Sequence, residues 1–82
     1  MEFNEYLQIV GENLRKLRFR ANLTQEAMED NELNVRYDTY RKLERAANKD
    51  IKLSTLFGIS KRLGMEPHEL LKVASIYGRK KK

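Results

Sequence analysis

Residues 24–45, with the sequence TQEAMEDNELNVRYDTYRKLER, hold two short helical patterns separated by a turn. The hydroxyl of Thr24 can cap a first helix, which we expect over residues 25–31. Residues 31–34 indicate a turn, and a second helix is expected over residues 36–47. Two short helices joined by a tight turn therefore form the centre of the predicted fold.

The second of these helices is amphipathic. Tyr40, Leu43 and Ala47 lie on one stripe at spacings of three and four residues, which predicts a buried face. The opposite face carries Asp38, Arg41, Lys42 and Arg45, with Tyr37 at its edge. Such a charged face is either a solvated helix surface or a surface that enters a DNA major groove, which is wide enough to admit a helix.

A longer helix precedes this pair, and two further helices are expected after it. Apolar residues stepping by three or four predict the first helix over residues 3–21, and they are Phe3, Tyr6, Leu7, Val10, Leu14 and Leu17. Another helix is expected over residues 53–63 and stops at Gly64. Its expected buried residues are Leu53, Leu56, Phe57, Ile59 or Ser60, and Leu63.

The last predicted helix begins at Pro67, a residue suited to the first helical position, and extends to about Tyr77. Its apolar residues outnumber those that so small a domain can bury. We therefore expect a dimer surface made by Leu70, Leu71, Val73, Ile76 and Tyr77, with burial in the monomer core as the alternative for Ile76 and Tyr77. Since no stretch alternates in the manner of a strand, the sequence predicts a compact all-α bundle of five helices.

Composition excludes several classes of function. The 82 residues include no Cys and one His, which removes disulfides, thiolate metal sites and most general-base chemistry. Neither a catalytic constellation nor a phosphate-binding glycine loop is present, so we expect no enzyme, metal, cofactor or small-molecule ligand. No apolar run exceeds two residues, so we expect neither a membrane-spanning helix nor a signal peptide. We expect the protein to be cytoplasmic.

The positive charge is concentrated at one end of the chain. The formal net charge is +5, with 17 Lys and Arg against 12 Asp and Glu. Four of the positive charges form the run of residues 79–82, and without them 13 basic residues face 12 acidic ones. This tail is either a solvated end or a source of phosphate contacts, so a nucleic-acid function must rest on where the other charges lie.

Five segments resemble the XRE (Cro/C1-type) helix-turn-helix family of DNA-binding proteins, because they occur in the order of that family and at nearly its spacing. They are Asn13–Arg18, Leu23–Glu26, Tyr40–Arg45, Ile51–Leu56 and Arg62–Leu71, so that the resemblance covers about residues 10–71. The small size and the short last helix are similar to restriction–modification controller proteins in particular.

The resemblance implies a lambda-repressor-like domain over residues 1–78, followed by the basic tail. It implies a sequence-specific regulator that binds double-stranded DNA as a homodimer on a palindromic operator. In a C2 dimer the two recognition helices would lie one DNA turn apart, ~34 Å. The alternative is an antitoxin or adaptor of the same fold whose main partner is another protein.

Roles follow for individual residues from the same resemblance. Arg18 and Glu44 correspond to a buried ion pair between the first helix and the recognition helix. The resemblance implies that Tyr37, Asp38 and Lys42 contact the bases, with Arg41 beside them. Phosphate contacts fall on Thr24, Gln25, Arg36, Arg45, Lys49 and Lys52.

Several alternatives stay open. Tyr37 either stacks on a sugar or a thymine methyl or merely covers Tyr40, and Asp38 either accepts a hydrogen bond from cytosine or is a first-turn acid. Gly58 either allows a close helix approach or has no such role. Ala46 replaces the glycine that usually ends the recognition helix, so we expect that helix to continue to Ala47, with Asn48 in the left-handed conformation.

One departure from the family pattern affects the recognition helix itself. The segment from Met28 to Leu33 is one residue longer than the pattern. An extra residue could rotate the following helix by about 100° and bring Arg41 or Arg45 to the bases instead.

Overall fold

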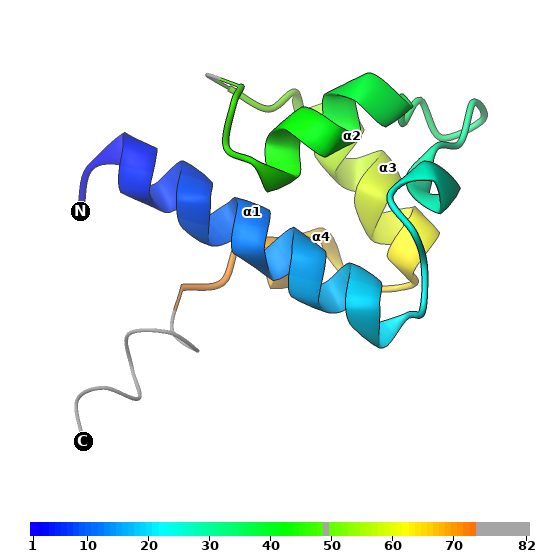
Figure 1. Cartoon of the computed structure of the whole chain (residues 1–82), viewed down its shortest axis with the longest axis horizontal. Helices are drawn as coiled ribbons and strands as arrows, with labels where there is room; N and C mark the ends of the chain where they lie inside the picture. The colour runs from blue at the N-terminus through cyan, green and yellow to red at the C-terminus, as the bar shows by residue number, and fades with distance from the viewer. Residues whose placement is uncertain (49, 74–82) are drawn as a thin grey trace.

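The computed structural model describes residues 1–48 and 50–73 of the chain (Figure 1). The elements within these residues are α1 (Phe3–Arg20), a single 3-10 turn η1 (Glu26–Met28), α2 (Tyr37–Glu44), α3 (Leu53–Leu63) and α4 (Pro67–Leu70). The described residues form no strand, and Asp30 and Val35 make an isolated antiparallel bridge. The all-α prediction is confirmed for this part of the chain, whereas the count of five α-helices is not.

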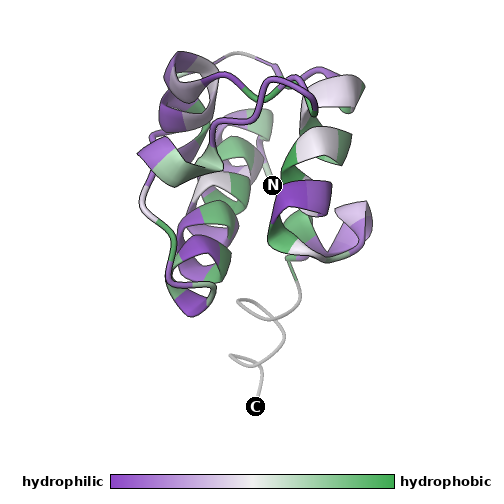
Figure 2. Cartoon of the chain, turned by 90° about the vertical axis from the view of Figure 1, so that its right-hand side faces the viewer, coloured by the Kyte–Doolittle hydropathy of each residue, from purple (hydrophilic) through white to green (hydrophobic). Residues whose placement is uncertain are grey.

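The core lies between α1 and the segments that pack on it. α1 contacts both α2 and α4, and α3 in turn contacts α4. Figure 1 shows α2 and α3 on one side of the long α1 helix. The helices combine hydrophobic and hydrophilic residues (Figure 2), as expected of helices that bury one face. The buried cluster consists of Val10, Leu14, Met28, Val35, Tyr40, Leu43, Leu56, Ile59 and Leu70.

The helix predicted over residues 25–31 is shorter in the structure than expected. Thr24 does act as the cap, because its Oγ1 accepts a hydrogen bond from Ala27 N at 3.1 Å. The turn ends at Met28, however, because Glu29 is extended and Asp30 exchanges two backbone hydrogen bonds with Val35, of 2.8 and 2.9 Å. Asp30 Oδ1 also accepts from the amides of residues 32 and 33, so this Asp forms a turn that competes with the helix.

The recognition-helix candidate α2 ends at Glu44, three residues before the predicted end. Ala46 has a φ of 56° and takes the left-handed position that was expected at Asn48. The amide of Ala47 donates a hydrogen bond of 2.9 Å to the carbonyl of Lys42, which gives one of the last carbonyl groups of the helix a partner. Ala46 thus fills the glycine position of the family pattern directly, at a cost on the order of 1 kcal/mol.

The last predicted helix is also shorter in the described residues. α4 ends at Leu70, and the amide of Leu71 bonds to the carbonyl of His68 at 3.1 Å. The side chain of Asn13 holds the following segment onto α1, because its Nδ2 donates to the carbonyls of Leu70 (3.1 Å) and Lys72 (2.7 Å). Ile76, Tyr77 and the basic tail lie outside the described residues.

The buried face of α3 agrees with the prediction in part. Leu56, Ile59 and Ser60 are buried as expected, together with Thr55 and Gly58. Leu53 and Phe57, also expected in the core, are 79% and 50% exposed, and Phe3 of α1 is 53% exposed. Ser60 is fully buried because its hydroxyl donates to the carbonyl of Phe57 at 2.7 Å.

Gly58 allows α3 to approach the backbone of Leu33 closely. A Cβ atom at position 58 would lie 2.2 Å from the carbonyl oxygen of Leu33. The Gly58→Ala variant is therefore expected to lower the free energy of unfolding by about 1–3 kcal/mol through overpacking. Intrinsic helix propensity alone would favour alanine by about 1 kcal/mol. Urea unfolding measures the sign, with Lys61→Ala at an exposed position of the same helix as the control; a stabilised Gly58→Ala protein would refute the close approach.

Candidate functional site

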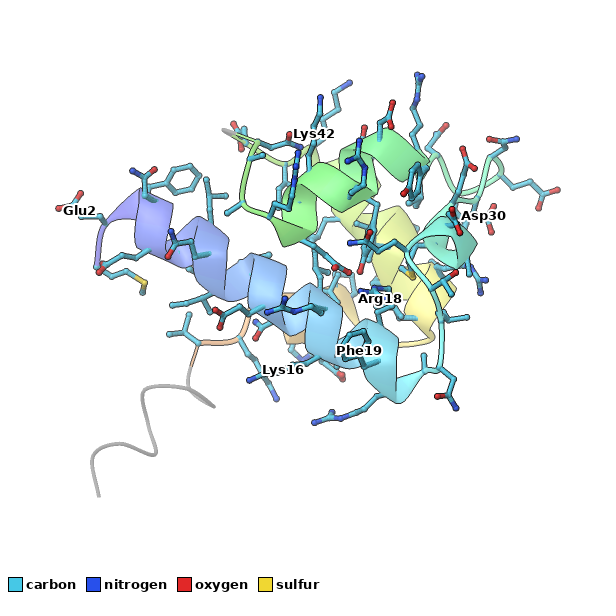
Figure 3. All side chains as sticks on the ribbon, viewed as in Figure 1. Glu2, Lys16, Arg18, Phe19, Asp30 and Lys42 are labelled. Atoms are coloured by element: carbon cyan, nitrogen blue, oxygen red, sulfur yellow. The ribbon has the colours of Figure 1, made fainter. Side chains whose placement is uncertain are left out.

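The candidate site is the outer side of α2, which the burial of two residues sets. Tyr40 and Leu43 are buried against the core, so the opposite side of this eight-residue helix faces solvent. Asp38, Lys42 and Arg45 are exposed there, and Arg41 is partly exposed at the flank. Lys42 extends from α2 on the side away from α1 (Figure 3).

Arg18 and Glu44 form the ion pair that joins α1 to α2. Arg18 Nε lies 2.6 Å from Glu44 Oε2, and a second nitrogen of the guanidinium donates to Oε1 at 3.1 Å. The two side chains are only 9% and 4% exposed. A third nitrogen of Arg18 donates to the carbonyl of Leu23 at 3.0 Å, which ties the entry to η1 to the same pair. This bidentate geometry holds the end of α2 at a defined place on α1.

The Glu44 carboxylate accepts hydrogen bonds from two further donors. Tyr40 OH donates to Oε2, and Gln25 Nε2 donates to Oε1 at 2.9 Å. The amide nitrogen of Gln25, a residue predicted to contact a DNA phosphate, therefore also takes part in this buried cluster. The Tyr40 contact could have been found from the sequence, since residues 40 and 44 lie one turn apart on one helix face.

The cluster of Arg18, Tyr40, Glu44 and Gln25 shifts the pKa values of its members. The hydrogen bond to Glu44 raises the pKa of Arg18. Burial, followed by the contact with Glu44, raises the pKa of Tyr40, so the phenol stays protonated and donates. Burial alone would raise the pKa of Glu44, but the hydrogen bonds from Arg18, Tyr40 and Gln25 outweigh it and lower that pKa below 4.5.

This lowered pKa makes the fold sensitive to acid. Because the folded pKa of Glu44 lies below its unfolded value, its contribution to stability is fully present above about pH 4.5 and is lost as the pH falls through the folded pKa. We expect the thermal midpoint of the wild type to fall more steeply from pH 7 to about pH 3 than that of Glu44→Gln, which has no carboxylate at this position. Parallel curves for the two proteins would contradict the assignment.

One flank of α2 presents Arg41 between two neighbours. The Arg41 guanidinium carbon lies 5.5 Å from the centroid of the Tyr37 ring, within cation–π range. Its Nη2 is 3.7 Å from Asp38 Oδ1, which is too long for a hydrogen bond. Its Nε is buried and has no hydrogen-bond partner among the described residues. Tyr37 is half-buried beneath this guanidinium, so it acts as a platform for Arg41.

The other flank of α2 borders a polar groove of about 450 Å³ that reaches the start of α3. Arg36 and Lys52, both expected at phosphates, line it as the residues that precede α2 and α3. Its other lining residues are Asn34, Thr39, Leu43, Asn48, Asp50, Ile51, Ser54 and Thr55. The first turn of α3 carries no acid, so the positive end of its helix dipole is not neutralised there.

The remaining predicted phosphate residues are not brought together with this groove. Thr24, Gln25 and Arg45 do not line it, since Thr24 caps η1, Gln25 binds Glu44, and Arg45 follows the end of α2. Lys49 lies outside the described residues.

The predicted dimer surface needs one correction. Leu70 is fully buried within the chain, because α4 presses it into the core between α1 and α3, and it offers no surface to a partner. Leu71 and Val73 are partly exposed. Leu71 also lines an apolar groove of about 200 Å³, together with Phe3, Tyr6, Leu7, Val10, Asp50, Ile51, Leu53 and Leu56.

Within the described ranges, no helix is long and apolar enough to cross a membrane, and no group of three or more His, Cys, Asp or Glu side chains is placed to hold a metal ion. Comparison of the chain with protein-family models, curated proteins and solved structures finds no significant match.

Proposed function

We propose that this chain is a helix-turn-helix protein that binds double-stranded DNA sequence-specifically as a homodimer and thereby regulates transcription in the cytoplasm. The observation that carries the proposal is the contrast between the two sides of α2. Its inner side is fixed to α1 by the buried Arg18–Glu44 pair, and its outer side presents Lys42, Arg45 and Arg41. In this proposal η1 and α2 are the two helical parts of the motif, and α2 enters the major groove.

Rigidity of α2 supports base recognition. Discrimination between bases requires side chains whose donors are held at the right place before binding. The three hydrogen bonds that Glu44 accepts from Arg18 and Gln25, together with the burial of Tyr40 and Leu43, hold α2 from one side. A merely solvated surface helix would need no such anchoring.

The polar groove between α2 and α3 supports a contact with the sugar–phosphate backbone. Arg36 and Lys52 supply two positive charges at its wall against the one negative charge of Asp50, and Asn34, Ser54 and Asn48 supply hydrogen-bonding groups. A DNA strand beside a major groove that holds α2 would pass along this flank, with the start of α3 directed at a phosphate. The near-neutral body of the chain makes such placed charges necessary.

A symmetric dimer would present two copies of α2 to one palindrome, and the exposed apolar groove supports it. Leu53 is 79% exposed at the rim of that groove, and Leu71 and Phe3 lie beside it. We expect wild-type protein to sediment as a dimer at micromolar concentration and Leu53→Asp to shift toward the monomer, because a carboxylate would be desolvated in the interface. Lys61→Asp, an exposed change on the same helix, is the charge control; a wild-type protein that stays monomeric both alone and on DNA would contradict the dimer.

The same apolar groove is the observation that favours the second candidate, an antitoxin or adaptor that binds another protein. Exposed apolar surface marks protein contacts without specifying the partner. The two candidates differ in their dependence on α2. Loss of base recognition abolishes the function of a DNA-binding regulator, whereas an adaptor that works through the groove would tolerate Lys42→Ala and fail with Leu53→Asp.

The experiment that tests the proposal is a selection from duplexes with a randomised central segment, using the intact chain. We expect enrichment of a palindromic sequence whose half-sites are spaced by about one helical turn. Footprinting on the enriched duplex should then show protection of both half-sites. Failure to enrich any sequence, with a protein that remains folded, would reject the proposed function.

A further inference from the structure

We propose that Arg41 contacts a guanine base, and that Tyr37 and Asp38 are positioning residues that hold its guanidinium for this purpose. The inference rests on the proposed function and adds the base class that the recognition helix selects. It reassigns Tyr37 and Asp38, which the family resemblance places at the bases, to supporting roles. The geometry of four side chains leads to it.

Arg41 has no strong partner within the described part of the chain. Glu44 is the acid three residues away on the same helix, but Arg18, Tyr40 and Gln25 already donate four hydrogen bonds to its two oxygens. Asp38, on the preceding turn, is 3.7 Å from Nη2 and leaves the Arg41 donors unsatisfied. The Arg41 side chain is 38% exposed and its buried Nε has no hydrogen-bond partner among the described residues, so its terminal nitrogens keep donors to offer to a ligand.

Tyr37 restricts where those donors point. The guanidinium rests over the Tyr37 ring at 5.5 Å, and Asp38 attracts the same group from the exposed side. An arginine held in this manner loses less side-chain freedom on binding than a free one. By contrast, no ion pair or cation–π contact holds Lys42 or Arg45 in the described structure.

The chemistry of the held group favours guanine over other acceptors. The planar fork of arginine matches the N7 and O6 acceptors of guanine in the major groove, where adenine presents an N6 donor instead of O6. Asp38 is 73% exposed beside the guanidinium and repels a phosphate, so a neutral base edge fits this position better than the DNA backbone does.

The test replaces single guanines of the selected duplex by 7-deazaguanine, which lacks the N7 acceptor. At one guanine in each half-site, we expect the wild type to lose about tenfold or more in affinity. Arg41→Ala should bind the unmodified duplex more weakly and show no further loss on the modified one. Lys42→Ala is the matched control and should keep the full sensitivity to 7-deazaguanine.

The conservative variants test the positioning roles. Arg41→Lys should lose most of the sensitivity, since an ammonium lacks the fork, and Tyr37→Leu should reduce it by loosening Arg41. An Arg41→Ala protein that keeps the full 7-deazaguanine penalty, or a selected site without any guanine, would overturn the assignment while leaving DNA binding intact. A wild type that selects no sequence at all would reject the proposed function and this inference together.

Discussion

Arg18→Ala is expected to lower the free energy of unfolding by about 3–5 kcal/mol, whereas Arg20→Ala should leave it nearly unchanged. The reason is the state of Glu44 after the change. Its carboxylate, 4% exposed, would keep the contacts with Tyr40 and Gln25 but lose its only charge partner among the described residues. The free energy of unfolding of a small domain is about 5–15 kcal/mol, so this loss would remove much of its stability.

Thermal and urea unfolding of the two variants measure this difference. Arg20 is the matched control, because it lies on the last turn of the same helix and is exposed. The double variant Arg18→Ala/Glu44→Ala should be less unstable than the sum of the single changes, since the two changes together leave no unpaired charge. Equal midpoints for Arg18→Ala and Arg20→Ala would show that the pair does not hold α1 and α2 together.

Lys42→Ala and Lys52→Ala are expected to weaken DNA binding in two different ways. Lys42 extends from the last turn of α2 on the side away from α1, where base edges would lie, so its loss should cost about 1–3 kcal/mol on the selected duplex and much less on random DNA. Lys52 lines the groove beside α3, so its loss should weaken both DNAs alike and reduce the salt slope by about 0.9.

Titrations of both duplexes at several salt concentrations separate these effects. Both lysines are exposed, so neither change should alter the unfolding midpoint, which serves as the control. The reverse pattern, with Lys42→Ala affecting both DNAs and Lys52→Ala only the selected one, would show that a different face of α2 meets the bases.

The sequence predicted local features correctly where a single residue determines the conformation of a helix end. The Thr24 cap and the left-handed Gly64, with a φ of 71°, are both present, because a hydroxyl before a helix and a glycine after one act within a single turn. The family resemblance supplied the Arg18–Glu44 pair, which no local pattern could give, since its partners are 26 residues apart.

The misses have a common physical cause, which is competition from a partner distant in the sequence or hidden in a turn. Asp30 ended the second predicted helix through its pairing with Val35, and Ala46 adopted a conformation that its Cβ disfavours because the chain must turn there. Gly58 of α3 packs on the backbone of Leu33, a contact that a helical wheel cannot show.

The proposed function requires that the outer face of α2 binds one DNA sequence in preference to others. Its most direct test is the ratio of the wild-type dissociation constants for scrambled and selected duplexes, measured by titration at near-physiological salt. A ratio of about 10³ or more, reduced by Lys42→Ala, is the expected result. A ratio near one, with both affinities falling together as salt rises, would contradict the claim and leave only charge attraction between this chain and DNA.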